Sequence, residues 1–186
     1  MGRNELNQLL QEKRQAKKQV FAHCWPKVDS GNPLLIVFAT EDKHVKELLF
    51  QLLEGLLVLP LQVVVVAKNQ PTGSNASSLR GKITWIDPGA IKQPQLEKYL
   101  LAADMGLIFE EHQATIKKLF QHGIIPVGCE KSPLLANYHP NDETGNSFTF
   151  NTINPWDIFS AVVRAYETYR FPFDWQHLIR GILKVR

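Results

Sequence analysis

The chain alternates between short apolar runs and segments in which apolar residues recur every three or four positions. Continuous apolar runs of strand length are typical of strands buried on both faces of a parallel sheet. Helical spacing of the apolar residues is typical of amphipathic helices. The pattern predicts six strands, at 34–39, 61–67, 82–86, 105–109, 124–128 and 147–150.

Helices are predicted between and after these strands, at 42–59, 94–103, 112–122 and 154–169, with a last one from near Asp174 that completes a C-terminal helical region over 154–184. Gly123 follows the third of them, at the position where glycine commonly ends a helix. Asn154 is the expected cap of the fourth, and Pro155 suits its first turn.

Residues 3–19 precede the first strand and read as a basic amphipathic helix. Leu6, Leu9 and Leu10 lie on one stripe and charged residues lie elsewhere. We expect an appended helix that docks on the neighbouring surface.

Strands that alternate with helices favour an α/β domain with a Rossmann-like, doubly wound and mostly parallel sheet, because parallel neighbours need crossover connections. No internal repeat or second core is visible, so residues 1–186 are expected to form one domain. In such sheets ligands bind beyond the carboxyl ends of the strands, where the strand order reverses. We therefore expect a site between strands 34–39 and 105–109, with loops 39–44 and 109–114 facing each other.

Composition agrees with an ordinary globular protein, since 44% of the 186 residues are hydrophobic and 21% are charged. The longest apolar run, 56–67, is interrupted by Pro60 and Gln62 and falls short of the roughly 20 residues that cross a bilayer. Residues 1–18 are polar and basic, unlike a secretory signal. A cytoplasmic protein without a membrane segment is expected.

Thiol and metal chemistry have no support in the sequence. The two cysteines, Cys24 and Cys129, lie far apart and outside any C-x-x-C spacing, which favours reduced thiols. None of the six histidines forms the i, i+4 pair that places two ligands on one helix face. We expect neither a metal nor a cofactor.

The formal net charge of +3 is concentrated at the amino end, where residues 1–27 hold six basic and two acidic side chains. A basic segment can attract nucleic acid or an anionic surface. This one has no aromatic residue before Phe21 and no nucleic-acid-binding motif. A solvated helix face is the favoured interpretation, and nucleic acid is not an expected partner.

Two stretches of the chain resemble the C-terminal half of bacterial glycogen synthases and plant starch synthases. That family reads A-A-D, a strand, F-E-P-C-G-L with a helix, Y-G-T-x-P, and later G-F-x-F followed by N-A-W and a helix with R-A. The corresponding text here is AADMGLIFEEHQATIKKLFQHGIIPV at 102–127 and GNSFTFNTINPWDIFSAVVRAY at 145–166. Residues 4–18 are similar to the family's basic opening helix, and Phe173-Asp174-Trp175 to its closing segment.

The resemblance implies a glycosyltransferase of the two-domain B type (GT-B). In that type this half binds the nucleotide-sugar donor, here ADP-glucose or UDP-glucose, and a separate N-terminal half or partner chain binds the α-glucan acceptor. It also implies which residues bind the donor and take part in the transfer. Glu110 falls on the glutamate of F-E-P-C-G-L, which contacts the donor sugar near its reacting carbon. Lys43 stands for the lysine that neutralises the diphosphate, with Lys46 as a second candidate, and Thr115 is expected to reach a phosphate oxygen or the ribose.

Glu110 has two interpretations on sequence alone. As a site residue, its carboxylate would orient sugar hydroxyls and stabilise positive charge as the sugar becomes oxocarbenium-like. As a structural residue, it would be a solvated acid at a strand end. Its place in the crevice that the topology predicts favours the first interpretation.

Several positions depart from the family. Glu111, His112 and Gln113 replace a glycine-containing turn whose amides approach the donor phosphates, and Glu111 would repel a diphosphate. Ala39 stands near the position of the family's arginine.

A further departure follows strand 124–128, where Ser132-Pro133-Leu134 replaces the family's G-G-L turn. Proline removes one amide donor there. Two hypotheses therefore stand side by side: a donor-binding glycosyltransferase domain, and a degenerate, non-catalytic module that interacts with a partner or with glucan.

Overall fold

The structure is a computed structural model that describes residues 3–68, 81–110 and 112–184. Its centre is a six-stranded sheet in the order β3-β2-β1-β4-β5-β6. Every pair of neighbouring strands is parallel. The strands are β1 (Leu34–Phe38), β2 (Gln62–Val66), β3 (Ile83–Ile86), β4 (Met105–Ile108), β5 (Ile125–Cys129) and β6 (Phe148–Phe150). The predicted Rossmann-like, doubly wound parallel sheet is confirmed.

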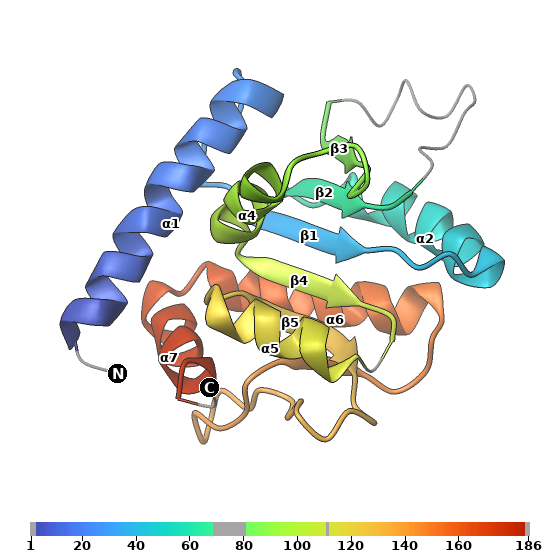
Figure 1. Ribbon diagram of the computed structural model, residues 1–186. Coiled ribbons are helices and arrows are strands. Elements are labelled where there is room, and N and C mark those ends of the chain that lie inside the picture. Colours follow the sequence, from blue (N-terminus) through green and yellow to red (C-terminus); the bar gives the residue numbers. More distant parts are fainter. Residues whose placement is uncertain (1–2, 69–80, 111, 185–186) are drawn as a thin grey trace.

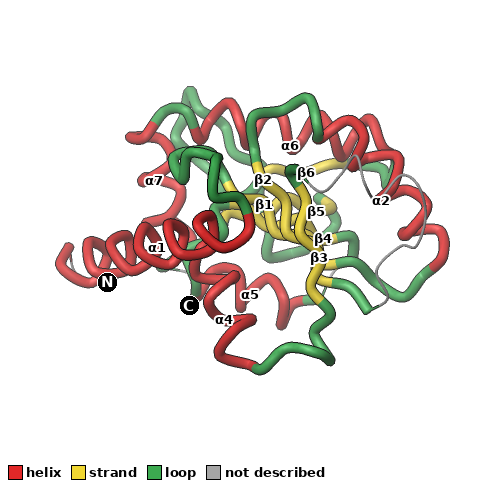
Figure 2. Tube along the Cα trace, turned by 90° about the horizontal axis from the view of Figure 1, so that it is seen from above, coloured by secondary structure: helices red, strands yellow, loops and turns green. Residues whose placement is uncertain are grey.

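Helices cover both faces of this sheet, with α2 and α6 on one side and α4 and α5 on the other (Figure 1 and Figure 2). The described helices are α1 (Arg3–Cys24), α2 (Lys43–Leu56), α4 (Gln93–Ala102), α5 (Gln113–Gln121), α6 (Pro155–Tyr169) and α7 (Pro172–Ile182). This arrangement buries the central strands on both faces, as their continuous apolar runs require.

The helix ends follow the local signals in the sequence. Asn154 caps α6 by accepting a hydrogen bond from the Asp157 N–H at 2.9 Å, as predicted. Gly123 follows α5 with φ +62°, a left-handed conformation that favours glycine. The last helix begins at Pro172, two residues before the predicted start.

The first helix is longer than predicted, since α1 continues past residue 19 to Cys24. Its last turns carry Val20 and Phe21, which are buried in the core, and the Phe21 ring packs edge-on against Trp25 at 5.3 Å. α1 packs on α4 and crosses the amino ends of the strands (Figure 1). The helix therefore docks on the domain as expected, but over a longer contact.

The prediction of a solvated basic face on α1 is wrong at two positions. Lys13 and Lys17 are only 6% and 7% exposed. Both ammonium groups lie against the amino edge of the sheet, where Lys17 Nζ is 2.6 Å from a carboxylate oxygen of Asp104, the residue before β4. Contacts across the sheet edge, rather than water, surround these two ammonium groups.

Candidate functional site

A cavity of about 530 Å³ lies at the carboxyl ends of β1, β2 and β4, and we name it the carboxyl-edge cavity. The strand order reverses between β1 and β4, so this is the switch point of the sheet. Residues 39–41 after β1 and residues 109, 110 and 112 after β4 line it together. The two loops that the sequence predicts to face each other therefore share one cavity.

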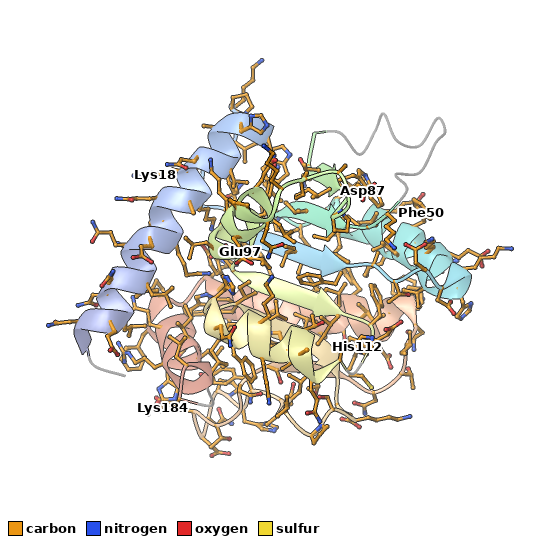
Figure 3. All side chains as sticks on the ribbon, viewed as in Figure 1. Lys18, Phe50, Asp87, Glu97, His112 and Lys184 are labelled. Carbon is orange, nitrogen blue, oxygen red and sulfur yellow. The ribbon has the colours of Figure 1, made fainter. Side chains whose placement is uncertain are left out.

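Glu110 and His112 form a direct contact at the rim of this cavity. The Oε2 atom of Glu110 lies 2.5 Å from Nε2 of His112. The side chains are 42% and 70% exposed, respectively, so both remain accessible to a ligand. The imidazole contacts the carboxylate that the sequence singles out, and Figure 3 shows His112 at the amino end of α5.

The amino end of α5 offers backbone donors to the carboxyl-edge cavity. His112 is the N-cap residue of α5 and makes no capping hydrogen bond through its side chain, and the first turn has no acidic residue. Half-buried Thr115 lines the cavity from this turn. The first N–H groups of a helix have no partner within the helix, so an anion is favoured there.

The amino end of α2 is arranged differently, because a carboxylate already occupies it. Asp42 accepts hydrogen bonds from the N–H groups of His44 at 2.7 Å and Val45 at 3.1 Å. These amides are the donors that a phosphate at α2 would use. An anion must displace Asp42 to reach them.

The two lysines predicted to bind the diphosphate lie on the first turn of α2. Neither is among the residues that line the carboxyl-edge cavity. Lys43 has a side chain that is 92% exposed, with Nζ 3.7 Å from Glu47. Lys46 forms an ion pair with Glu41 at 3.1 Å. Acidic neighbours in the same segment therefore hold both ammonium groups.

Three other predicted site residues, Gln113, Ser132 and Leu134, are not among the residues that line the cavity. Gln113 is exposed at the start of α5. Ser132 is buried in the turn after β5, and its hydroxyl has no hydrogen-bond partner among the described atoms. Leu134 is half-buried and packs against the core. Glu111 lies outside the described residues.

Three further polar residues line the cavity: Thr40 and Glu41, which lie in the predicted loop 39–44 but were not singled out, and Lys68, which was not predicted. All three closely follow a strand that ends at this edge, and that position was the available signal. With them included, the cavity carries the carboxylates of Glu41 and Glu110 against the ammonium group of Lys68 and the imidazole of His112. The lining therefore has no marked excess of positive charge.

Neither a metal-binding cluster nor a membrane-spanning helix is present in the described part of the chain. Within residues 3–68, 81–110 and 112–184, no group of three or more His, Cys, Asp or Glu side chains could hold a metal ion. In the same ranges, no helix combines the length and the apolar character needed to cross a bilayer.

Part of the chain is similar in sequence to glycogen synthases. Over 61 residues it is 38% identical to glycogen synthase 1 of Synechocystis sp. and 34% identical to the glycogen synthase of Trichodesmium erythraeum. Over 62 residues it is 34% identical to the glycogen synthase of Bacillus cytotoxicus. The first two matches cover 31% of this chain and 13% of each relative. The resemblance inferred from the motifs is confirmed for this third of the chain.

The fold is shared with a nucleotide-sugar enzyme. The structure of UDP-GlcNAc 2-epimerase from Neisseria meningitidis, bound to UDP-GlcNAc, superposes with a TM-score of 0.56 and 10% identity. The superposition covers 92% of this chain and 46% of the epimerase chain. At this identity the likeness shows the fold alone. No family model matches the chain.

Proposed function

We propose that this chain is the donor-binding half of a glucosyltransferase similar to glycogen synthase, and that a nucleotide sugar binds in the carboxyl-edge cavity. One observation carries the proposal: the cavity at the switch point contains Glu110 and Thr115, in a chain of which a third is glycogen-synthase-like. A volume of about 530 Å³ is within the usual range of small-molecule sites.

Each lining group has a role in this proposal. The Glu110 carboxylate, oriented by His112, binds hydroxyls of the glucose and stabilises positive charge that develops at the reacting carbon. The uncapped N–H groups of α5 and the Thr115 hydroxyl bind phosphate oxygens. Phe38 and Val66, at the ends of their strands, supply apolar surface for the base.

The charge of the diphosphate is met by three lysines. Lys68 lines the cavity directly. Lys43 and Lys46 reach it by exchanging their surface ion pairs with acidic side chains for the ligand. Exposed ion pairs contribute only about 0–1 kcal/mol, so this exchange costs little.

Transfer of glucose needs a second component. An acceptor-binding N-terminal domain or partner chain must hold the α-glucan, because the two reactants have to meet in one geometry. The expected donor is ADP-glucose or UDP-glucose, and the transfer requires no further cofactor.

Calorimetric titration with ADP-glucose and UDP-glucose tests the proposal. We expect at least one donor to bind at millimolar concentration or below, and Glu110→Gln to weaken that binding about tenfold, the effect of losing one charge-assisted contact. Lys43→Ala should give a smaller loss, since its side chain is exposed. The matched control is Glu54→Gln, which changes an exposed carboxylate on the outside of α2.

The second candidate is a non-catalytic module that interacts with a partner or with glucan. The charge balance of the cavity favours it, because two carboxylates line the site and Asp42 occupies the amino end of α2. Heat signals absent for both donors, or unaffected by Glu110→Gln, would reject the first proposal. Co-sedimentation of the same protein with glycogen would then support the second.

A further inference from the structure

A larger cavity, of about 690 Å³, lies at the opposite edge of the sheet, and we name it the amino-edge cavity. Its walls come from α1, the loop before β1 (residues 30–33) and the junction of α6 with α7. The carboxyl-edge cavity shares no residue with it. Anything that binds here therefore does so separately from the proposed donor.

One face of α1 gives this cavity its charge. Lys13, Arg14, Lys17 and Lys18 all line it, at the spacing that places side chains on one helical face. Arg170 lines it from the end of α6, and Asp104 is the one acidic residue among the described residues of the lining. Like charges three and four positions apart repel one another, so a bound anion would stabilise this face.

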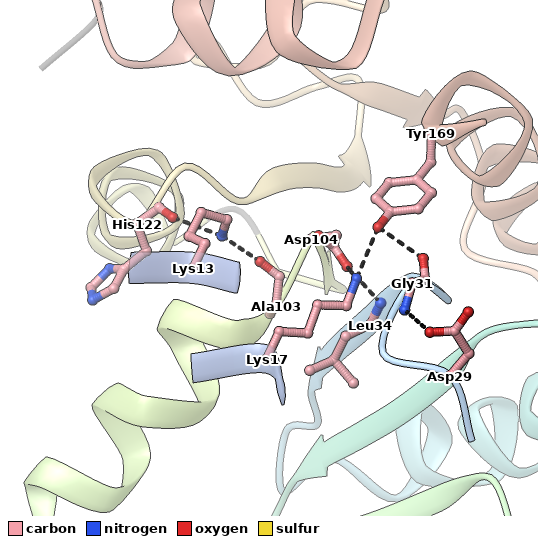
Figure 4. A network of polar contacts seen from close by, with 9 residues as sticks. All are labelled: Lys13, Lys17, Asp29, Gly31, Leu34, Ala103, Asp104, His122 and Tyr169. Atoms are coloured by element: carbon pink, nitrogen blue, oxygen red, sulfur yellow. Dashed lines mark hydrogen bonds and ion pairs between the residues drawn. The ribbon is translucent and has the colours of Figure 1, made fainter. Parts of the chain in front are cut away.

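Lys13 and Lys17 are the buried half of this basic cluster on α1, and Figure 4 shows their contacts. Lys13 Nζ donates to the carbonyl oxygens of Ala103 at 2.6 Å and His122 at 3.0 Å. Lys17 Nζ donates to Asp104 at 2.6 Å and to the Tyr169 hydroxyl at 2.9 Å. An ammonium group has three donors, so each lysine keeps one N–H beyond these bonds.

The carboxylate of Asp104 is shared by two partners, which both contact it through one oxygen atom. The same Oδ2 atom that meets Lys17 accepts the N–H of Leu34 at 2.8 Å. Lys13 therefore has no carboxylate of its own, and burial lowers its pKa to about 8 although Asp104 acts in the opposite direction. Its positive charge is poorly compensated in the absence of a ligand.

No hydrogen bond or ion pair within the described ranges explains the presence of the exposed half of the basic cluster, Arg14 and Lys18. Arg14 and Lys18 are exposed, and neither forms a hydrogen bond or ion pair with any residue in the described ranges. Figure 3 shows Lys18 on α1, far across the molecule from His112. These two cations and the buried pair line the same concave surface.

The remaining lining suits an uncharged portion of a ligand. Ser30, Asn32 and Gln176 add a hydroxyl and two carboxamides, and half-buried Tyr166 adds a ring. A cavity of this size, with a few polar groups and an aromatic wall, fits a small molecule better than a chain. Several cations on one wall select a multiply charged anion, for which phosphate is the common chemistry.

We propose that the amino-edge cavity binds a small organic phosphate, whose phosphate group lies against Arg14, Lys18 and Lys17 and whose organic part lies against Tyr166. The site is separate from the donor site, and it combines the exposed Arg14 and Lys18 with Lys17, which already pairs with Asp104. Nucleic acid is the competing ligand for a basic helix, and the experiment distinguishes it.

Calorimetric titration of the full chain with inorganic phosphate and with phenyl phosphate tests this site. We expect both to bind, phenyl phosphate more tightly. The double variant Arg14→Ala/Lys18→Ala should lose at least tenfold in affinity, and Tyr166→Leu should remove the advantage of phenyl phosphate. The control is Lys98→Ala/Lys117→Ala, which removes two exposed charges on α4 and α5.

The outcomes separate this proposal from the proposed function. Glu110→Gln should leave phenyl phosphate binding unchanged, and Arg14→Ala/Lys18→Ala should leave donor binding unchanged. Equal losses in the two double variants would show non-specific charge attraction and overturn the proposal. Absence of binding would also overturn it, and so would a labelled oligonucleotide that binds through Arg14 and Lys18 where phenyl phosphate does not.

Discussion

The two cavities lie at opposite edges of one sheet and differ in how they hold charge. At the carboxyl edge, Lys43 is exposed and Lys46 is half-buried, and they pair with acids four and five residues away in the sequence. At the amino edge, Lys13 and Lys17 are buried and meet groups far away in the sequence. The order of the strands therefore determines where a crevice forms. Local packing determines whether a cation near it can contact a ligand, pairs with a neighbouring side chain or is buried as part of the fold.

The strongest test of this contrast is the removal of Asp104. Asp104→Ala leaves Lys17 buried without its carboxylate and Leu34 without its acceptor. Breaking a buried ion pair from one side typically costs about 3–5 kcal/mol, and we expect a loss of this size in the free energy of unfolding by urea. Glu110→Ala, at the exposed rim, should change it by less than about 0.5 kcal/mol. Similar losses for both variants would remove the distinction between the edges.

The pH dependence of stability gives a smaller effect at the amino edge. The pKa of Lys13 is lowered from 10.5 to about 8 by burial, so the folded protein releases this proton before the unfolded chain does. The unfolded state then binds more protons above about pH 8, and the free energy of unfolding rises with pH. Between about pH 8 and 9.5 the gain from this group should reach at most about 2 kcal/mol, at 1.36 kcal/mol for each pH unit.

Lys13→Met should abolish this rise, and Lys98→Met, on the exposed face of α4, should preserve it. Burial acts to lower the pKa of Lys17, but Asp104 and Tyr169 together outweigh it and raise the pKa, so the stabilisation by Lys17 is lost only at still higher pH. The measurement is urea unfolding at a series of pH values. A rise with pH that persists in Lys13→Met would show that another group causes it.

The smallest expected effect is at the amino end of α2. Asp42→Ala removes the cap and should lower the free energy of unfolding by about 1 kcal/mol. It also frees the N–H groups of His44 and Val45, so binding of the donor diphosphate at the carboxyl edge should become tighter. Glu54→Ala removes the same charge from the exposed face of α2 and is the control. Unchanged donor affinity in Asp42→Ala would mean that α2 does not face the ligand.

Much of the fold was predictable because apolar runs report burial directly. The run at 34–38 has to be covered on both faces, and the alternation with helices then requires parallel neighbours and a switch point. Glu110 could be placed in the crevice for the same reason, since it closely follows the strand that borders it, whereas Thr115 was expected there from the family resemblance.

Burial of Lys13 and Lys17 could not be predicted from the sequence. Their partners, Ala103 and Asp104, lie 90 and 87 residues away, and no local pattern pairs them. Likewise, the direction of Lys43 depends on how the Asp42 cap sets the first turn of α2, which periodicity does not specify. Sequence patterns were enough to predict the helices and strands and their order. The orientation of individual charged side chains depends on how these elements pack, which the patterns do not specify.

The buried ion pair between α1 and Asp104 also bears on how this fold can be transplanted. A fragment that starts at β1 would contain all six strands, but it would lack α1. Asp104, next to the central strand β4, would then have no lysine partner. The first helix and the sheet therefore form one structural unit that should be transferred together. Protein engineers who recombine domains of this kind should place their junction upstream of it.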